Sequence, residues 1–139
     1  MQDLVTRARE KAKSLAGQSF VRPEILTKLA QMSRNELDSL DFGVVKVDDH
    51  GTILIYNRYE SELASIPPSQ AEGKNFFKEI APCTNNHLFY GTFKEGVKRG
   101  DLNHLFLYTF TYKMRPTNVN VHLYRDKLSG SNFILVQKR

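Results

Sequence analysis

Hydrophobic and polar residues alternate with a period of two along several parts of the chain, which predicts β-strands. The longest run, HLFLYTFTYKM at residues 104–114, is followed by two shorter ones, VNVHL and NFILVQK, on either side of the turn-forming string DKLSGS. The same alternation, broken by the turn DDHG, predicts a β-hairpin over residues 42–57. On the longest strand, one face would carry four aromatic residues and a methionine. These are Phe106, Tyr108, Phe110, Tyr112 and Met114.

A period of three to four predicts helices near the start of the chain. Residues 3–16 would form an amphipathic helix that ends at Gly17. The string SRNE, at residues 33–36, is a possible capping box that opens a short helix. In a capping box the serine side chain accepts a hydrogen bond from the backbone N–H three residues later, and the glutamate side chain accepts one from the backbone N–H of the serine. Two unpaired N–H groups at the helix start are satisfied in this way.

Further helices are predicted between the two groups of strands. RYESELASI reads as a short helix closed by Pro67 and Pro68, and SQAE could cap a single turn that Gly73 would end. Asn85 and Asn86 are candidate caps of a longer helix. That helix would place Phe89, Phe93 and Val97 on one face and end near Gly100.

The order of these elements predicts an α+β domain, in which a central five-stranded antiparallel sheet carries helices on one face and has a helical N-terminal extension. Residues 1–28 would form the extension and residues 29–139 the domain itself. A length of 139 residues, with 40% hydrophobic and 25% charged residues, fits one globular domain. We expect it to be a monomer.

Charge is concentrated in the predicted extension. Residues 1–34 hold seven basic and three acidic side chains, a net charge of +4 out of +5 for the chain. A basic arm can contact nucleic acid or an anionic membrane surface, but it is more often the solvated face of a helix, so we expect no nucleic-acid binding. No apolar run is long enough to span a membrane, and we predict a cytoplasmic protein without membrane insertion.

Cys83 is the one cysteine of the chain, which excludes an intrachain disulfide and suits a reducing compartment. The four histidines are scattered, so no metal site is predicted. Motifs of nucleotide binding and of hydrolase or metalloprotease catalysis are absent from the sequence. A Cys83 and His87 pair at i and i+4 is weak evidence for a nucleophile, and we predict that the protein is not an enzyme.

Tyr56 and Glu60 form a second combination of interest, because a strand end followed by a helix could bring a phenol and a carboxyl into one crevice. Taken alone, each has an ordinary explanation, as a half-buried strand-end tyrosine and a solvated helix residue. A single cysteine among apolar residues is likewise more often structural than reactive.

The strings GKNFFKEIAPCTNNHLFYGTFKEGV, LNHLFLYTFTYKMRPT and ILIYNRYE together resemble the photoactive yellow protein family of bacterial blue-light receptors, which have the PAS fold. The resemblance runs from about Leu29 to Phe133. It implies that residues 29–139 form a PAS-type photosensor domain, and that Cys83 carries 4-hydroxycinnamic acid (p-coumaric acid) as a thioester. Tyr56 and a protonated Glu60 would bind the phenolate oxygen of this chromophore. The family's pocket positions correspond to Ala64, Ile66, Phe76, Ile80, Tyr108, Phe110, Tyr112 and Met114.

The implied mechanism is a trans-to-cis isomerisation followed by proton transfer from Glu60 and partial unfolding, which an unknown downstream signalling protein would read. We expect the N-terminal segment to loosen most, because its helices are short. Ala64 and Ile66 depart from the family, which commonly has a threonine and an arginine there. Losing that cation should raise the pKa of the phenol. The alternative function is a PAS module for ligand binding or protein interaction that has lost its chromophore.

Overall fold

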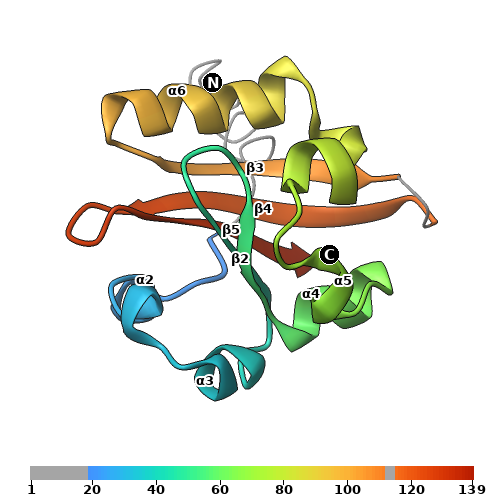
Figure 1. The fold of residues 1–139 in the computed structure, drawn as a ribbon, viewed down its shortest axis with the longest axis horizontal. Helices are drawn as coiled ribbons and strands as arrows, with labels where there is room; N and C mark the ends of the chain where they lie inside the picture. The colour runs from blue at the N-terminus through green and yellow to red at the C-terminus, as the bar shows by residue number, and fades with distance from the viewer. Residues whose placement is uncertain (1–18, 112–114) are drawn as a thin grey trace, which may run out of the picture.

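The computed structural model describes residues 19–111 and 115–139. The predicted helix at residues 3–16 lies outside the described residues, and so do Tyr112 and Met114. The described part forms a single five-stranded sheet with helical segments on both of its faces (Figure 1).

The sheet is antiparallel throughout, in the order β2-β1-β5-β4-β3. The first hairpin and the last three strands were predicted from alternation, but their joining is a tertiary feature: β1 pairs with β5, and Val45 lies opposite Ile134. This leaves β2 and β3 as the two edges of the sheet. The strands are β1 Gly43–Val47, β2 Ile53–Tyr56, β3 Asn103–Phe110, β4 Thr117–Asp126 and β5 Ser131–Lys138.

One face of the sheet is covered by the helical segments that follow β2 in sequence (Figure 1). They bury the larger core, in which Phe77, Phe89 and Phe93 pack against Val121 and Ile134 of the sheet. Two short π-helices bury three large rings in this core, Phe76 and Phe77 from the first and Phe89 from the second. The segments are α4 Arg58–Ala64, α5 Pro68–Ala71, the π-helix η2 Phe76–Ile80, the 3₁₀-helix η3 Pro82–Thr84, the π-helix η4 His87–Gly91, and α6 Thr92–Arg99.

The opposite face is covered by the described part of the N-terminal segment, which comprises α2 Pro23–Leu26, the 3₁₀-helix η1 Leu29–Gln31, and α3 Arg34–Asp38. These short helices bury a second core, in which Leu29 and Leu37 contact Phe133 and Leu135 of β5. The predicted boundary after residue 28 falls between α2 and η1, which share this core, and it stays a prediction.

The predicted capping box is confirmed. The Ser33 side chain accepts from the backbone of Glu36 at 3.2 Å, and the Glu36 carboxylate accepts from the backbone of Ser33 at 3.1 Å. Asn86 caps the π-helix that contains Phe89, since its side chain accepts a hydrogen bond from the Phe89 backbone at 2.9 Å. Asn85, the other candidate, ends the preceding 3₁₀-helix instead.

Three local predictions are wrong. Ser69 does not cap a helix, because Pro67 is the N-cap of α5 and Pro68 is its first helical residue, where a missing N–H costs nothing. The prolines therefore open α5 rather than close α4, which ends where Ser65 adopts a left-handed conformation with φ of 56°. The strand predicted over residues 104–114 is shorter where it is described, because β3 ends at Phe110.

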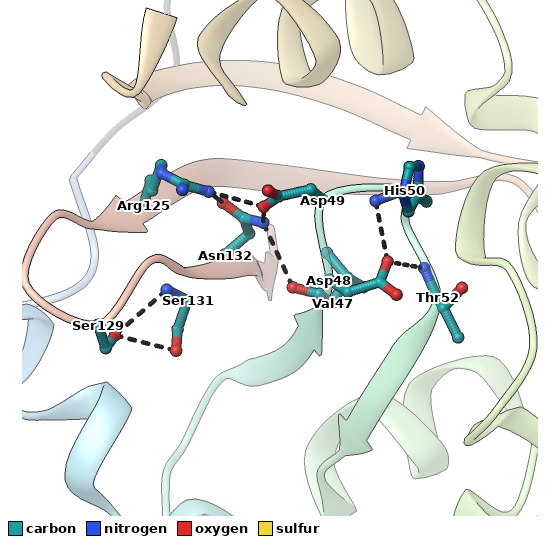
Figure 2. Close-up of polar contacts among 9 residues, drawn as sticks. All are labelled: Val47, Asp48, Asp49, His50, Thr52, Arg125, Ser129, Ser131 and Asn132. Atoms are coloured by element: carbon teal, nitrogen blue, oxygen red, sulfur yellow. Dashed lines mark hydrogen bonds and ion pairs between the residues drawn. The ribbon is translucent and has the colours of Figure 1, made fainter. Parts of the chain in front are cut away.

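Two turns at the same end of the sheet are joined by polar contacts around the buried side chain of Asn132 (Figure 2). Arg125 of β4 donates to Asp49 in the β1–β2 turn and to Asn132 of β5, each at 2.8 Å. The fully buried Asn132 amide also donates to Asp49 at 2.9 Å. The first hairpin is thereby fixed to β4 and β5 by residues that lie 76 and 83 positions after Asp49 in sequence. Across the described part of the chain, no helix is both long enough and apolar enough to cross a membrane.

Candidate functional site

A cavity lies where the end of β2, α4, η2, η3 and the end of β3 meet. Its walls are mainly apolar, and the exceptions are one phenol, one carboxyl and one thiol. None of the described lining residues is a lysine or an arginine. The lining residues are Tyr56, Glu60, Leu63, Ala64, Ile66, Phe76, Ile80, Ala81, Cys83 and Phe110.

Tyr56 and Glu60 reach the cavity from the junction of β2 and α4. The strand ends at Tyr56, Asn57 caps the helix, and Glu60 lies in its first turn. Both side chains are buried, with exposed fractions of 1% and 3%. Burial raises the pKa of Tyr56 well above its usual range, and the nearby Glu60 carboxyl raises it further.

The Glu60 carboxyl is buried without a complete set of partners. Its Oε2 atom is inaccessible to solvent and has no hydrogen-bond partner. Burial alone raises the pKa of Glu60 to about 8, so the carboxyl is mostly protonated at neutral pH. A neutral carboxylic acid carries one O–H donor, and here it faces a cavity that also contains a phenol. The combination suits an anionic oxygen bound between two hydroxyl groups.

The buried side chain of Asn57 holds the junction of β2 and α4 in place. Its Oδ1 atom accepts from the backbone N–H groups of Val44 at 2.9 Å and Glu60 at 3.2 Å. Its amide group donates to the backbone carbonyls of Leu37 at 2.8 Å and Phe42 at 3.1 Å. Asn57 is fully buried, so it connects the Glu60 helix to β1 and to the N-terminal segment without access to water.

Cys83 lies on η3, with its side chain half-buried at the cavity. The turn is tightened by Thr84, whose hydroxyl donates to the Ala81 carbonyl at 2.6 Å. The Cys83 carbonyl accepts from the Tyr108 hydroxyl and from the Asn86 amide, at 3.1 Å for the amide. Asn86 also donates to the Tyr108 hydroxyl at 2.7 Å. These contacts hold the thiol-bearing turn against β3.

Ala64 and Ile66 line the cavity at and just after the end of α4. The left-handed Ser65 turns the chain back, and Ile66 is anchored to Ser61 through its backbone N–H at 3.2 Å and its carbonyl at 2.8 Å. The side chain of Ile66 lines the cavity with hydrocarbon and brings no charge to it.

The structure brings most of the predicted residues together. Tyr56, Glu60 and Cys83 line the cavity, as do the predicted wall residues Ala64, Ile66, Phe76, Ile80 and Phe110. Tyr108 is not part of the wall; it packs edge-to-face on Phe89, with ring centroids 5.0 Å apart, and bonds the Cys83 backbone. The predicted wall residues Tyr112 and Met114 lie outside the described residues.

Two lining residues, Leu63 and Ala81, were not predicted. The spacing of Glu60, Leu63 and Ala64 on α4 was a usable signal, because residues three and four apart share a helix face. Ala81 had none, since it follows the π-helix that ends at Ile80. Within the described residues, no group of three or more histidine, cysteine, aspartate or glutamate side chains could hold a metal ion.

Comparison with known proteins gives consistent results. Residues 31–134 match the family model described as PAS fold. Over 119 residues the chain is 45% identical to the photoactive yellow protein of Rhodothalassium salexigens and 40% identical to that of Halochromatium salexigens, covering 86% of this chain and 95% of each relative. Its structure is similar, with a TM-score of 0.76 and 37% identity, to the photoactive yellow protein domain of the sensor histidine kinase Ppr from Rhodospirillum centenum, covering 80% of this chain and 97% of that domain.

Proposed function

The chain belongs to the photoactive yellow protein family and has the PAS fold, and from this premise we propose that it is a blue-light receptor whose pigment is 4-hydroxycinnamic acid bound to Cys83. The observation that carries the proposal is the shared cavity of Cys83, Tyr56 and Glu60, in which a buried carboxyl oxygen has no partner. An unpaired buried polar atom is costly, and a ligand that accepts a hydrogen bond would remove the cost.

The residues fit such a group at both ends. The Cys83 sulfur would form the thioester bond by displacing an activating group from the pigment's carboxyl carbon, with the thiol proton leaving alongside that group. The Tyr56 hydroxyl and the protonated Glu60 carboxyl would donate to the phenolate oxygen. The apolar wall between them would exclude water. When bound, the pigment supplies absorption of blue light and a trans-to-cis isomerisation of its double bond.

Glu60 would then pass its proton to the phenolate oxygen and remain as a carboxylate in an apolar cavity. An uncompensated buried charge costs about 3–5 kcal/mol, against a typical domain stability of about 5–15 kcal/mol. Hydration of the carboxylate by partial unfolding is therefore energetically accessible. The N-terminal segment would open first, because its helices are short and Asn57 connects them to the Glu60 helix.

In this role the protein is a sensory module rather than an enzyme, located in the cytoplasm, where a thiol stays reduced. A downstream signalling protein would read the opened state.

The test is to mix the purified chain with an activated ester of 4-hydroxycinnamic acid and measure mass and absorbance. We expect a gain equal to one acyl group, replacing one hydrogen, and a visible absorption band. Cys83→Ala should fold, gain no mass and stay colourless. A wild-type chain that stays colourless and unmodified would refute the proposal and favour a PAS module without this pigment.

A further inference from the structure

Glu72 is the point at which α3 meets the strand that carries Tyr56. Its Oε2 atom accepts from the backbone N–H of Tyr56 at 3.0 Å. The same carboxylate accepts two hydrogen bonds from the Arg34 guanidinium, at 2.7 Å to Oε2 and 3.0 Å to Oε1. Arg34 is the first residue of α3. One carboxylate therefore binds the cavity strand and the N-terminal segment at once.

The edge of the sheet explains why this side chain is needed. Beside Ile53 the chain after α5 runs along β2, with Ile53 donating to the Lys74 carbonyl and accepting from Gly73, both at 2.8 Å. Further along β2, the residues before Gly73 are in α5, so Tyr56 has a strand partner only on its inner side, where it lies opposite Val45 of β1. Glu72, at the C-cap of α5, supplies the missing acceptor from its side chain.

The two residues after Tyr56 also contact α3. Asn57 donates to the Leu37 carbonyl at 2.8 Å, and the backbone N–H of Arg58 donates to the Asp38 carboxylate at 2.8 Å. Three successive positions are thus connected to one short helix, and the connection at Tyr56 is the one that runs through an ion pair.

We propose that Glu72 is a positioning residue for Tyr56 and that Arg34 holds Glu72 in place, so that the docking of α3 and the position of Tyr56 in the cavity depend on each other. This inference rests on the proposed function, in which the Tyr56 hydroxyl binds the pigment. Coupling of this kind is reciprocal. A displacement of Tyr56 weakens the contact of Glu72 with Arg34, and detachment of α3 loosens Tyr56.

The ion pair is accessible to solvent, which limits its strength. The side chains of Arg34 and Glu72 are 48% and 24% exposed. Bidentate geometry favours the pair over an ordinary surface contact, and added salt weakens it. The coupling should therefore be moderate and sensitive to ionic strength.

Hydrogen exchange on the full chain without pigment tests the connection. In Arg34→Gln and Glu72→Gln, the amides of Tyr56 and of α3 should exchange about three to ten times faster than in wild type, as expected for loss of a bidentate pair. The double variant should match the single ones, because they remove the same interaction. Arg58→Gln is the matched control, since it removes an arginine from the pair with Glu62, whose side chains are 74% and 69% exposed.

Equal exchange in Arg34→Gln and Arg58→Gln would overturn the inference. A second readout separates positioning from mere stability: in the pigment-loaded chain, the absorbance titration of the phenol should move to higher pH in Arg34→Gln and Glu72→Gln but not in Arg58→Gln. Arg34→Lys, which keeps the charge without the two-pronged contact, should lie between. An unmoved titration would refute positioning and leave the proposed function intact. A wild-type chain that takes no pigment would refute the proposed function and leave the exchange result standing.

Discussion

The Glu60 carboxyl lies directly against the backbone of Gly43, so closely that a β-carbon added to Gly43 would come within 2.2 Å of Glu60 Oε2 and 3.3 Å of Glu60 Cβ. Gly43 begins β1, and Glu60 lies in the first turn of α4. The position of the buried acid is therefore set by a missing side chain on the neighbouring strand. No other residue type would leave the carboxyl where it is.

Gly43→Ala should displace Glu60 and lower the free energy of unfolding by about 1–3 kcal/mol, the usual cost of overpacking a core. Urea unfolding measures it. Gly91→Ala is the control, because its β-carbon would meet only the His87 side chain, at 3.2 Å, and helical alanine is favoured over glycine. In a Glu60→Ala background the cost of Gly43→Ala should shrink; an equal cost in both backgrounds would contradict the close contact.

The sequence predicts features that depend on near neighbours. Alternation located all five strands, and the Ser33 and Asn86 caps followed from side chains that bond the backbone three residues away. The sequence could not predict that Gly43 lies against Glu60 or that Glu72 accepts a hydrogen bond from Tyr56, because both contacts depend on how distant segments pack. The π-helices have no local sequence signature either. Because their turns are wider than those of an α-helix, predictions based on α-helical spacing put their side chains on the wrong face.

For the cavity, periodicity identified the correct face of β3 but not which part of that face is open. Phe110 lines the cavity, whereas Tyr108, two residues earlier on the same face, is covered by Phe89. The grouping of Tyr56, Glu60 and Cys83 came from resemblance, since their spacing alone allowed ordinary roles. Their shared cavity is a property of the fold.

The stability of the pigment-free chain should depend on pH through two buried groups of opposite sign. The pKa of Glu60 is raised by burial from 4.5 to about 8, so the folded state holds the proton longer and stability falls as pH rises between these values. The pKa of His122 is lowered from 6.5 to about 4, by burial and by His104, so stability there rises with pH. The imidazole contacts Asn103 through Nε2 at 2.5 Å, while Nδ1 has no partner.

The two effects should nearly cancel between pH 4.5 and 6.5, and above pH 6.5 the free energy of unfolding should fall by about 1.4 kcal/mol per pH unit up to pH 8. Glu60→Gln should abolish this fall and reveal a rise below pH 6.5. His122→Gln should instead fall steadily from pH 4.5 to pH 8. Urea unfolding at a series of pH values measures all three, and superimposable profiles would show that neither group titrates as described.

Asn57→Ala should lower the free energy of unfolding by about 2–5 kcal/mol, because it leaves several buried backbone groups without partners. The two carbonyls that it releases belong to Leu37 and Phe42, so the N-terminal segment should become the least protected part of the chain in hydrogen exchange. Asn118→Ala is the control: Asn118 is exposed and accepts one bond from the Thr109 hydroxyl, at 2.7 Å. Equal losses in the two variants would contradict this role of Asn57.

Arg125→Met should lower the free energy of unfolding by about 1–3 kcal/mol. The side chain of Asn132 is fully buried, and its amide oxygen would lose a charged hydrogen-bond donor (Figure 2). Lys127→Met is the control. It removes a cation two residues after Arg125, from an ion pair with Asp101 whose side chains are 71% and 69% exposed, and it should lower the free energy of unfolding by less than about 0.5 kcal/mol. Thermal unfolding of both variants distinguishes them. Similar melting temperatures would mean that the joined turns add no stability.

Ile66→Arg should lower the pKa of the phenol in the pigment-loaded chain, because a cation beside the cavity favours the phenolate. The wild-type cavity has no lysine or arginine among its described lining residues, so a bound phenolate would be stabilised by hydroxyl donors alone. We therefore expect the wild type to gain an ultraviolet-absorbing, protonated form as pH falls from about 9 to about 5. Ile66→Arg should keep its visible band to lower pH, whereas Ile66→Met, similar in size and uncharged, should titrate like wild type. A wild-type visible band that does not change over this range would show that Tyr56 and Glu60 stabilise the phenolate without a cation.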